Sequence, residues 1–133
     1  MVSTNGCFDL LHIGHVRALE RAKGCGDVLI VCVNSDRSIQ AIKGPSRPIV
    51  MEADRLGLLS ALYCVDFVTL FEEKSPTDLL LYLRPHIHIK GGEYQEGFLE
   101  KEALIRAGIE VRIVESGSSE STTHLIQKIK EIG

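Results

Sequence analysis

The sequence predicts an α/β fold, namely one Rossmann-like, doubly wound domain with a five-stranded parallel sheet that spans residues 1–133. Strand-like and helix-like segments alternate along the whole chain. One strand candidate, residues 27–33, is continuously apolar after its first residue, as a parallel strand covered on both faces should be. No repeat, low-complexity tract or linker divides the chain, and its 44% hydrophobic content is enough for one core.

The first half of the chain is predicted from apolar spacing and from its turn residues. A short strand at residues 2–4 precedes a helix from Ile13 onward, where apolar residues recur near helical spacing. The strand at 27–33 ends in polar residues. A stretch with one glycine and two prolines, residues 42–48, is expected to lack regular structure, and helical spacing returns at residues 51–62.

The second half continues the alternation. The expected elements are a strand at 65–71, a helix at 79–83, a strand at 86–90, a helix at 98–107, a strand at 109–114 and a final helix opened by Ser121, Thr122 and Thr123. Ser75 followed by Pro76 is a helix-start signal, and Gly108 marks a helix end. The final helix carries an apolar stripe of Leu125, Ile126, Ile129 and Ile132.

Composition argues against several classes of protein. A net charge of −3 argues against broad nucleic-acid binding, which needs a basic surface. No apolar run reaches the roughly 18–20 residues of a membrane span, and no signal-peptide pattern opens the chain, so we expect a cytoplasmic protein without membrane association. The four cysteines, at positions 7, 25, 32 and 64, form no C-x-x-C pair, so we expect reduced thiols and no structural zinc.

Residues 5–15 are the most informative segment, because they place two glycines and two histidines at a crossing from strand to helix. Unpaired N–H groups and the positive end of the helix dipole favour an anion there. His12 and His15, one turn apart, can add donors from the same face. Alone, such a pair is more often a surface or capping feature. It could also bind metal, but no third metal ligand has recognisable spacing. We interpret the segment as a phosphate-binding loop.

Four motifs in order carry a resemblance to a known family. They are Gly6-x-Phe8-Asp9-x-x-His12-x-Gly14-His15, Lys43-Gly44-x-x-Arg47-Pro48, Lys90-Gly91-Gly92-Glu93-Tyr94 and Ser121-Thr122-Thr123. Together they resemble the cytidylyltransferase-like nucleotidyltransferases, whose fold is of the α/β phosphodiesterase type, over nearly the whole chain. Within that family the chain looks most like the D-glycero-β-D-manno-heptose 1-phosphate adenylyltransferases. It differs from them at Glu93, where they usually have aspartate, and it lacks the arginine that glycerol-3-phosphate cytidylyltransferases carry before Ser121.

The resemblance implies a reaction between ATP and a sugar 1-phosphate that gives an ADP-sugar and pyrophosphate. It implies Mg²⁺ carried with ATP, a homodimer, and a product used for lipopolysaccharide or another heptose polymer. Two alternatives stay open. One is a cytidylyltransferase acting on glycerol 3-phosphate or another phosphorylated alcohol, and the other is a non-catalytic ATP-binding module. An aminoacyl-tRNA synthetase also uses a His-Ile-Gly-His motif. That class is disfavoured because the chain lacks the Lys-Met-Ser-Lys-Ser partner motif and the length and basic surface for tRNA.

The resemblance also assigns roles to residues. Catalytic roles fall to His12, His15 and Lys43. The residues expected to bind nucleotide are Asn5, Gly6, Cys7, Phe8, Gly14, Arg55, Ser121, Thr122 and Thr123. The residues expected to bind the sugar substrate are Asp9, Asp36, Lys90, Gly91 and Glu93. No residue is assigned as a metal ligand, although Asp9 or Asp36 could help to hold Mg²⁺. His86 and His88 share one side of a strand and are expected to be packing or edge residues.

Overall fold

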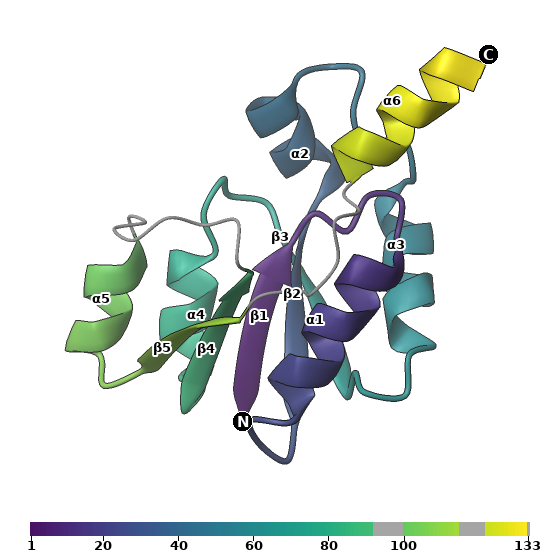
Figure 1. Ribbon diagram of the computed structural model, residues 1–133. Helices are drawn as coiled ribbons and strands as arrows, with labels where there is room; N and C mark the ends of the chain where they lie inside the picture. Colours follow the sequence, from purple (N-terminus) through teal and green to yellow (C-terminus); the bar gives the residue numbers. More distant parts are fainter. Residues whose placement is uncertain (92–99, 115–121, 133) are drawn as a thin grey trace.

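A computed structural model describes residues 1–91, 100–114 and 122–132 and confirms the predicted fold class. The elements in chain order are β1 (Val2–Gly6), α1 (Ile13–Lys23), β2 (Leu29–Asn34), α2 (Asp36–Lys43), α3 (Glu52–Ser60), β3 (Phe67–Phe71), α4 (Thr77–Leu83), β4 (Ile87–Gly91), α5 (Glu100–Arg106), β5 (Glu110–Val114) and α6 (Thr122–Ile132). The five strands form one parallel sheet in the order β3-β2-β1-β4-β5 (Figure 1).

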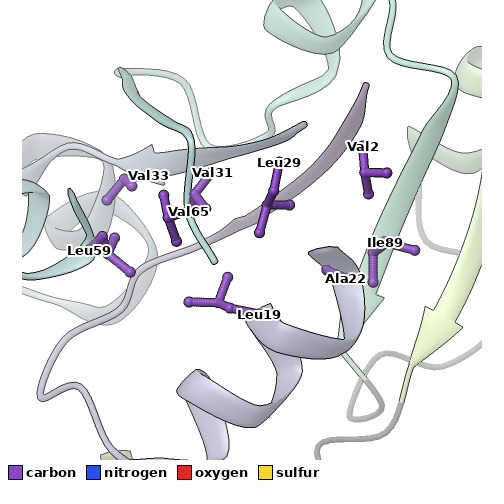
Figure 2. Close-up of a cluster of buried hydrophobic side chains, with 9 residues drawn as sticks. All are labelled: Val2, Leu19, Ala22, Leu29, Val31, Val33, Leu59, Val65 and Ile89. Carbon is purple, nitrogen blue, oxygen red and sulfur yellow. The ribbon is translucent and has the colours of Figure 1, made fainter. Parts of the chain in front are cut away.

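One face of the sheet is covered by α1 and α3 over an apolar core. Its buried side chains, shown in Figure 2, are Val2, Leu19, Ala22, Leu29, Val31, Val33, Leu59, Val65 and Ile89. Removing this much apolar surface from water is the main favourable term in folding. We call this side the α1/α3 face.

The opposite face is covered by α4 and α5, which makes the sheet doubly wound as predicted. Its apolar cluster is smaller and consists of Cys32, Phe71, Leu80, Leu104 and Ile109. Successive side chains of a strand alternate between faces, so Ser3, which follows Val2, points to this side together with its register partner His88. We call this side the α4/α5 face.

The strand order predicts where a ligand-binding crevice lies. The chain moves from β1 to β2 and β3, and then returns past β1 to β4, so the order reverses between β1 and β4. The pairing of β1 with β2 continues to Gly6–Val33, whereas its pairing with β4 stops at Thr4–Ile89. The two strands therefore part at their carboxyl ends, which is where open α/β sheets bind ligands.

Helix α2 is missing from the sequence prediction. Its only buried apolar residue is Ile39, so it has almost no periodic signal. Two polar groups begin it: the Ser35 hydroxyl accepts from the Ser38 amide at 3.1 Å, and the Glu52 carboxylate accepts from the Asp36 amide at 2.9 Å. The second contact comes from α3, so no local pattern could have revealed it.

The predicted final helix exists, but its apolar stripe is not packed into the core. Ile129 and Ile132 are 62% and 88% exposed, and α6 extends away from the sheet in Figure 1. Ser75 caps α4 by accepting from the Thr77 amide at 3.3 Å, while Pro76 takes the N-cap position itself. No helix in the described part of the chain is both long and apolar enough to cross a membrane.

Candidate functional site

The loop after β1 is strained and closely packed. Phe8 and Leu10 have φ values of 52° and 53°, which cost a side-chain-bearing residue about 1–2 kcal/mol each. A Cβ on Gly6 would lie 3.0 Å from the Phe8 ring, so this position has room only for glycine while the ring stays there. Strain of this kind persists only where the surrounding structure fixes the backbone.

His12 and His15 cap the start of α1 with their own rings. His12 Nδ1 accepts from the Gly14 amide at 3.1 Å, and His15 Nδ1 accepts from the His12 amide at 3.1 Å. An Nδ1 that accepts carries no proton, so each neutral ring holds its proton on Nε2. The rings lie 4.0 Å apart between centroids. The helix start therefore carries two adjacent N–H donors of fixed tautomer.

His15 is neutral at physiological pH. Burial is the main cause that lowers its pKa to about 4, and the electrostatic interactions with His12 and with the Lys43 charge lower it further. Its ring also contacts Phe8, with 5.4 Å between centroids. A neutral His15 ring can donate a hydrogen bond to an anion, but it carries no positive charge at neutral pH.

Asp9 holds the loop that follows α2. Its carboxylate accepts from the Ile49 and Val50 amides at 2.9 Å each and from Arg47 Nε at 3.1 Å. Burial would raise the pKa of Asp9, but the Val50 and Ile49 amides and the Arg47 guanidinium outweigh it and lower the pKa. Asp9 is 1% exposed, so its place in the fold is that of a loop anchor, which differs from the expected contact with substrate hydroxyls.

Arg47 is held at the site by its contact with Asp9. Its Nη2 atom is a buried side-chain nitrogen that has no hydrogen-bond partner among the described residues. A buried guanidinium nitrogen without an acceptor is costly, and an anion at this point would satisfy it. The sequence placed Arg47 in a motif but gave it no role; the missing signal was its pairing with Asp9.

Arg55 lies deeper than its expected role in nucleotide binding requires. Its side chain has no exposed surface. Nε donates to the Val50 carbonyl, Nη1 to the Cys7 and Asn34 carbonyls, and Nη2 to the Asp36 carboxylate, at distances of 2.7–2.9 Å. Arg55 thus ties the loop after β1 to the end of β2, and its role in nucleotide binding stays a prediction.

Lys43, at the end of α2, lies close enough to the loop after β1 for its charge to act on that loop. Lys43 ends α2 with an exposed side chain, and its charge reaches both His15 and Cys7. Burial raises the pKa of the Cys7 thiol against the opposing charges of Lys43 and Arg55, so Cys7 stays protonated.

Asp36 is partly exposed, with a side chain 25% accessible. Gly14 is buried in the first turn of α1.

The β4 side of the crevice carries a buried ion pair. Lys90 Nζ lies 2.5 Å from Glu100 Oε1, and the two side chains are 3% and 9% exposed. Glu100 has no role in the sequence prediction, because only the packing of α5 against β4 brings its carboxylate to Lys90. Gly91 ends β4, as expected. Glu93 and Ser121 lie outside the described residues, and Thr122 and Thr123 are described only as the first residues of α6.

His88 is a buried, hydrogen-bonded residue beside the site that the sequence did not indicate. It is 0% exposed, and its ring bonds Ser3 Oγ at 2.7 Å and Asn5 Oδ1 at 3.1 Å. The sequence placed it on one side of a strand without a role. The sequence does show that two polar residues of β1, Ser3 and Asn5, lie on one side of their strand. It could not show that they contact a histidine of β4, because these contacts join residues 83–85 positions apart.

No three histidine, cysteine, aspartate or glutamate side chains gather into a metal-binding group within the described ranges. The described cysteines at positions 7, 25, 32 and 64 are all free thiols.

Comparisons with known proteins identify the family of this chain. A family model described as cytidylyltransferase-like matches residues 3–128. The bifunctional protein HldE of Helicobacter pylori (strain G27) is 49% identical over 131 residues, which is 98% of this chain. The bifunctional protein HldE of Syntrophotalea carbinolica is 45% identical over 130 residues, or 97% of this chain. The chain spans 26–27% of the length of these relatives.

Solved structures share the fold. A lipopolysaccharide core biosynthesis protein from Thermoplasma volcanium superposes with a TM-score of 0.71 at 34% identity, covering 90% of this chain and 97% of that one. Pantothenate synthetase from Thermus thermophilus superposes with a TM-score of 0.61 at 19% identity, covering 86% of this chain and 55% of that one, and shows similarity of fold alone.

Proposed function

The chain belongs to the cytidylyltransferase-like family and is a nucleotidyltransferase, and we propose that it joins ATP to D-glycero-β-D-manno-heptose 1-phosphate. The products are ADP-heptose and pyrophosphate. The observation that carries the proposal is the pair of histidine rings at the start of α1, each fixed as an Nε2–H donor. Similarity to the HldE proteins over nearly the whole chain supports the choice of substrates.

The reaction is an in-line displacement at the α-phosphate of ATP. An oxygen of the sugar phosphate attacks the α-phosphorus, a new P–O bond forms, and the bond to the β-phosphate oxygen breaks to release pyrophosphate. The attacking oxygen is already an anion, so no residue must remove a proton from it. Catalysis then consists of alignment and of stabilising charge that moves towards the leaving pyrophosphate.

His12 and His15 donate to phosphate oxygens in this scheme. A neutral imidazole in a partly buried site loses little on desolvation and offers one directed donor. Because the pKa of His15 is about 4, the donor is present throughout the neutral range. The dipole of α1 adds to the stabilisation of negative charge at the same point.

Cations complete the charge balance. Lys43, whose charge reaches His15, bridges the two reacting phosphates, and the Nη2 atom of Arg47 donates to a phosphate oxygen. Arg55 and Asp9 act indirectly by fixing the loops that carry these groups. The family resemblance gives Ser121, Thr122 and Thr123 the role of further hydroxyl and amide donors to the nucleotide.

Magnesium fits this site as a companion of the triphosphate. Asp9 uses both carboxylate oxygens for the loop, whereas Asp36 gives one oxygen to Arg55 and its second has no hydrogen bond with described residues. Asp36 is therefore the carboxylate better placed to help hold the ion. Bound Mg²⁺ supplies neutralisation of phosphate charge.

The reaction is tested by pyrophosphate release in the presence of Mg²⁺ and D-glycero-β-D-manno-heptose 1-phosphate, with ATP and CTP in parallel. Release with ATP alone supports the proposal. Release with CTP alone would replace it by a cytidylyltransferase. Measurable ATP binding without release from either nucleotide would point to another phosphorylated acceptor or to a non-catalytic module.

His15→Ala tests the histidine pair. We expect kcat to fall at least about 100-fold, because loss of one donor to developing charge typically costs a factor of 10²–10³. His86→Ala is the matched control: this histidine is exposed at the opposite end of the sheet, against the chain's amino group. Normal turnover by a folded His15→Ala protein would remove His15 from the mechanism.

A further inference from the structure

A buried chain of three polar side chains crosses from β4 to the end of β1. The His88 ring lies between Ser3 and Asn5, with Nδ1 2.7 Å from Ser3 Oγ and Nε2 3.1 Å from Asn5 Oδ1. An amide oxygen can only accept, so Nε2 must carry the ring proton. Nδ1 then accepts from the Ser3 hydroxyl. The chain therefore has one direction, with each donor pointing towards Asn5.

His88 keeps this state over a wide pH range. Burial is the main cause that lowers its pKa to about 3, and the charge of Lys90 on the same strand lowers it further. The ring is neutral wherever the enzyme is folded near neutral pH, and its only exchangeable proton is directed at Asn5. His88 is thus a permanent donor rather than an acid or base.

Asn5 stands where β1 and β4 part. The last register pair between these strands is Thr4–Ile89, so Asn5 is the first residue of β1 beyond it. Asn5 is partly exposed, whereas Ser3 and His88 are buried. Its Nδ2 group makes no hydrogen bond with the described residues, while its Oδ1 is held by His88. One end of the carboxamide is anchored and the other is available to a ligand.

We propose that His88 is a positioning residue that holds the Asn5 carboxamide so that its Nδ2–H donor meets an oxygen of a bound phosphate substrate. The inference rests on the proposed function, which supplies two such substrates, ATP and the sugar phosphate. The shared chemistry is an acceptor oxygen, from a phosphate or a hydroxyl group. An unanchored carboxamide can rotate by 180° and present its own oxygen, which repels an anion; the bond from His88 removes that state.

Two substitutions at one position separate this role from a merely structural one. From Cβ, the amide of asparagine lies where the imidazole has Nδ1, and the amide of glutamine lies where it has Nε2. His88→Gln keeps a donor for Asn5 and weakens the bond to Ser3. His88→Asn keeps a partner for Ser3 and loses the donor to Asn5. Each variant retains one of the two bonds, so the two should lose similar thermal stability.

Steady-state kinetics with ATP and the sugar phosphate give the readout. We expect His88→Gln to retain kcat/KM within about threefold, and His88→Asn to lose about tenfold or more, the equivalent of one directed hydrogen bond. The substrate whose KM rises in His88→Asn is the one whose oxygen Asn5 contacts. Equal activities of the two variants, or the reverse order, would overturn the proposal.

A double-mutant cycle checks that the effect passes through Asn5. In an Asn5→Ala background, His88→Asn should cost no further activity, because the group it positions is absent. A full additional loss in that background would assign His88 to overall stability instead and reject the positioning role.

An NMR measurement separates failure of this inference from failure of the proposed reaction. If the wild-type enzyme releases no pyrophosphate, the proposed function fails, but the Asn5 side-chain amide can still be followed during titration with Mg²⁺–ATP and with the sugar phosphate. We expect its ¹⁵N and ¹H signals to shift with at least one ligand in wild type and His88→Gln, and not in His88→Asn. No shift with either ligand in wild type, or the same shift in both variants, would overturn the inference.

Discussion

Among the described residues, the apolar cluster on the α1/α3 face has nine buried side chains, whereas the cluster on the α4/α5 face has five and lies beside an ion pair and a hydrogen-bonded histidine. Apolar contacts stabilise without regard to direction, while buried polar groups stabilise little but fix geometry. The polar groups run from β4 to the carboxyl end of β1, beside the crevice. The difference indicates that the α1/α3 face supplies most of the folding free energy. The α4/α5 face contributes less, because its buried polar groups orient residues near the crevice.

Breaking the ion pair should give the largest loss of stability. Lys90→Met leaves the Glu100 carboxylate, 9% exposed, without the cation that faces it. Removing one partner of a buried pair typically costs about 3–5 kcal/mol. Denaturant unfolding should show this loss, and Lys90→Met/Glu100→Leu should recover most of it, because well-packed apolar residues can replace such a pair. A double variant no more stable than Lys90→Met would contradict this account of the α4/α5 face.

A cavity on the α1/α3 face should cost slightly less and leave chemistry intact. Leu59 is fully buried in the apolar core, one turn of α3 after Arg55, and has no polar group that could contact a substrate. Leu59→Ala should lower the free energy of unfolding by about 3 kcal/mol through lost apolar burial and a cavity. The fraction that remains folded should keep its kcat, measured well below the new Tm. A large fall in kcat at full folding would show that this face also positions the site.

Particular residues show how far the sequence could predict these two faces. Apolar patterns predicted most of the described strands and helices, because burial imposes a period on the sequence, and the Ser75-Pro76 start signal predicted α4. Helix α2 was missed because a single apolar residue and a cap from Glu52 hold it. The site motifs predicted which residue types gather at the crevice. They did not predict that Arg55 would bond backbone carbonyls, since a ligand oxygen and a carbonyl oxygen are chemically alike to a guanidinium.

Acid should weaken the protein partly through the α4/α5 face. In the unfolded chain His88 takes up a proton near pH 6.5, whereas burial keeps its folded pKa at about 3. Between these values the unfolded state binds more protons, so stability rises with pH and is lost as pH falls. His15 acts in the same sense. His88→Gln should therefore lose about 2 kcal/mol less than wild type between pH 7 and 4.5. Parallel pH profiles of unfolding free energy would contradict the burial of a neutral ring.

The smallest expected difference compares neighbouring residues that face opposite ways. Ser3→Ala removes the hydroxyl that bonds Nδ1 of the buried His88 ring, and leaving such an atom without a partner costs about 1–3 kcal/mol. Thr4 donates from Oγ1 to the Ile89 carbonyl at 2.9 Å on the α1/α3 face. Thr4→Val keeps the side-chain shape, and the carbonyl lies in a sheet with other donors, so we expect a loss of about 1 kcal/mol or less. Chemical denaturation of both variants measures the difference. A larger loss of unfolding free energy for Thr4→Val than for Ser3→Ala would contradict this comparison. It would mean that the α1/α3 face depends more on its hydrogen bonds than the α4/α5 face does.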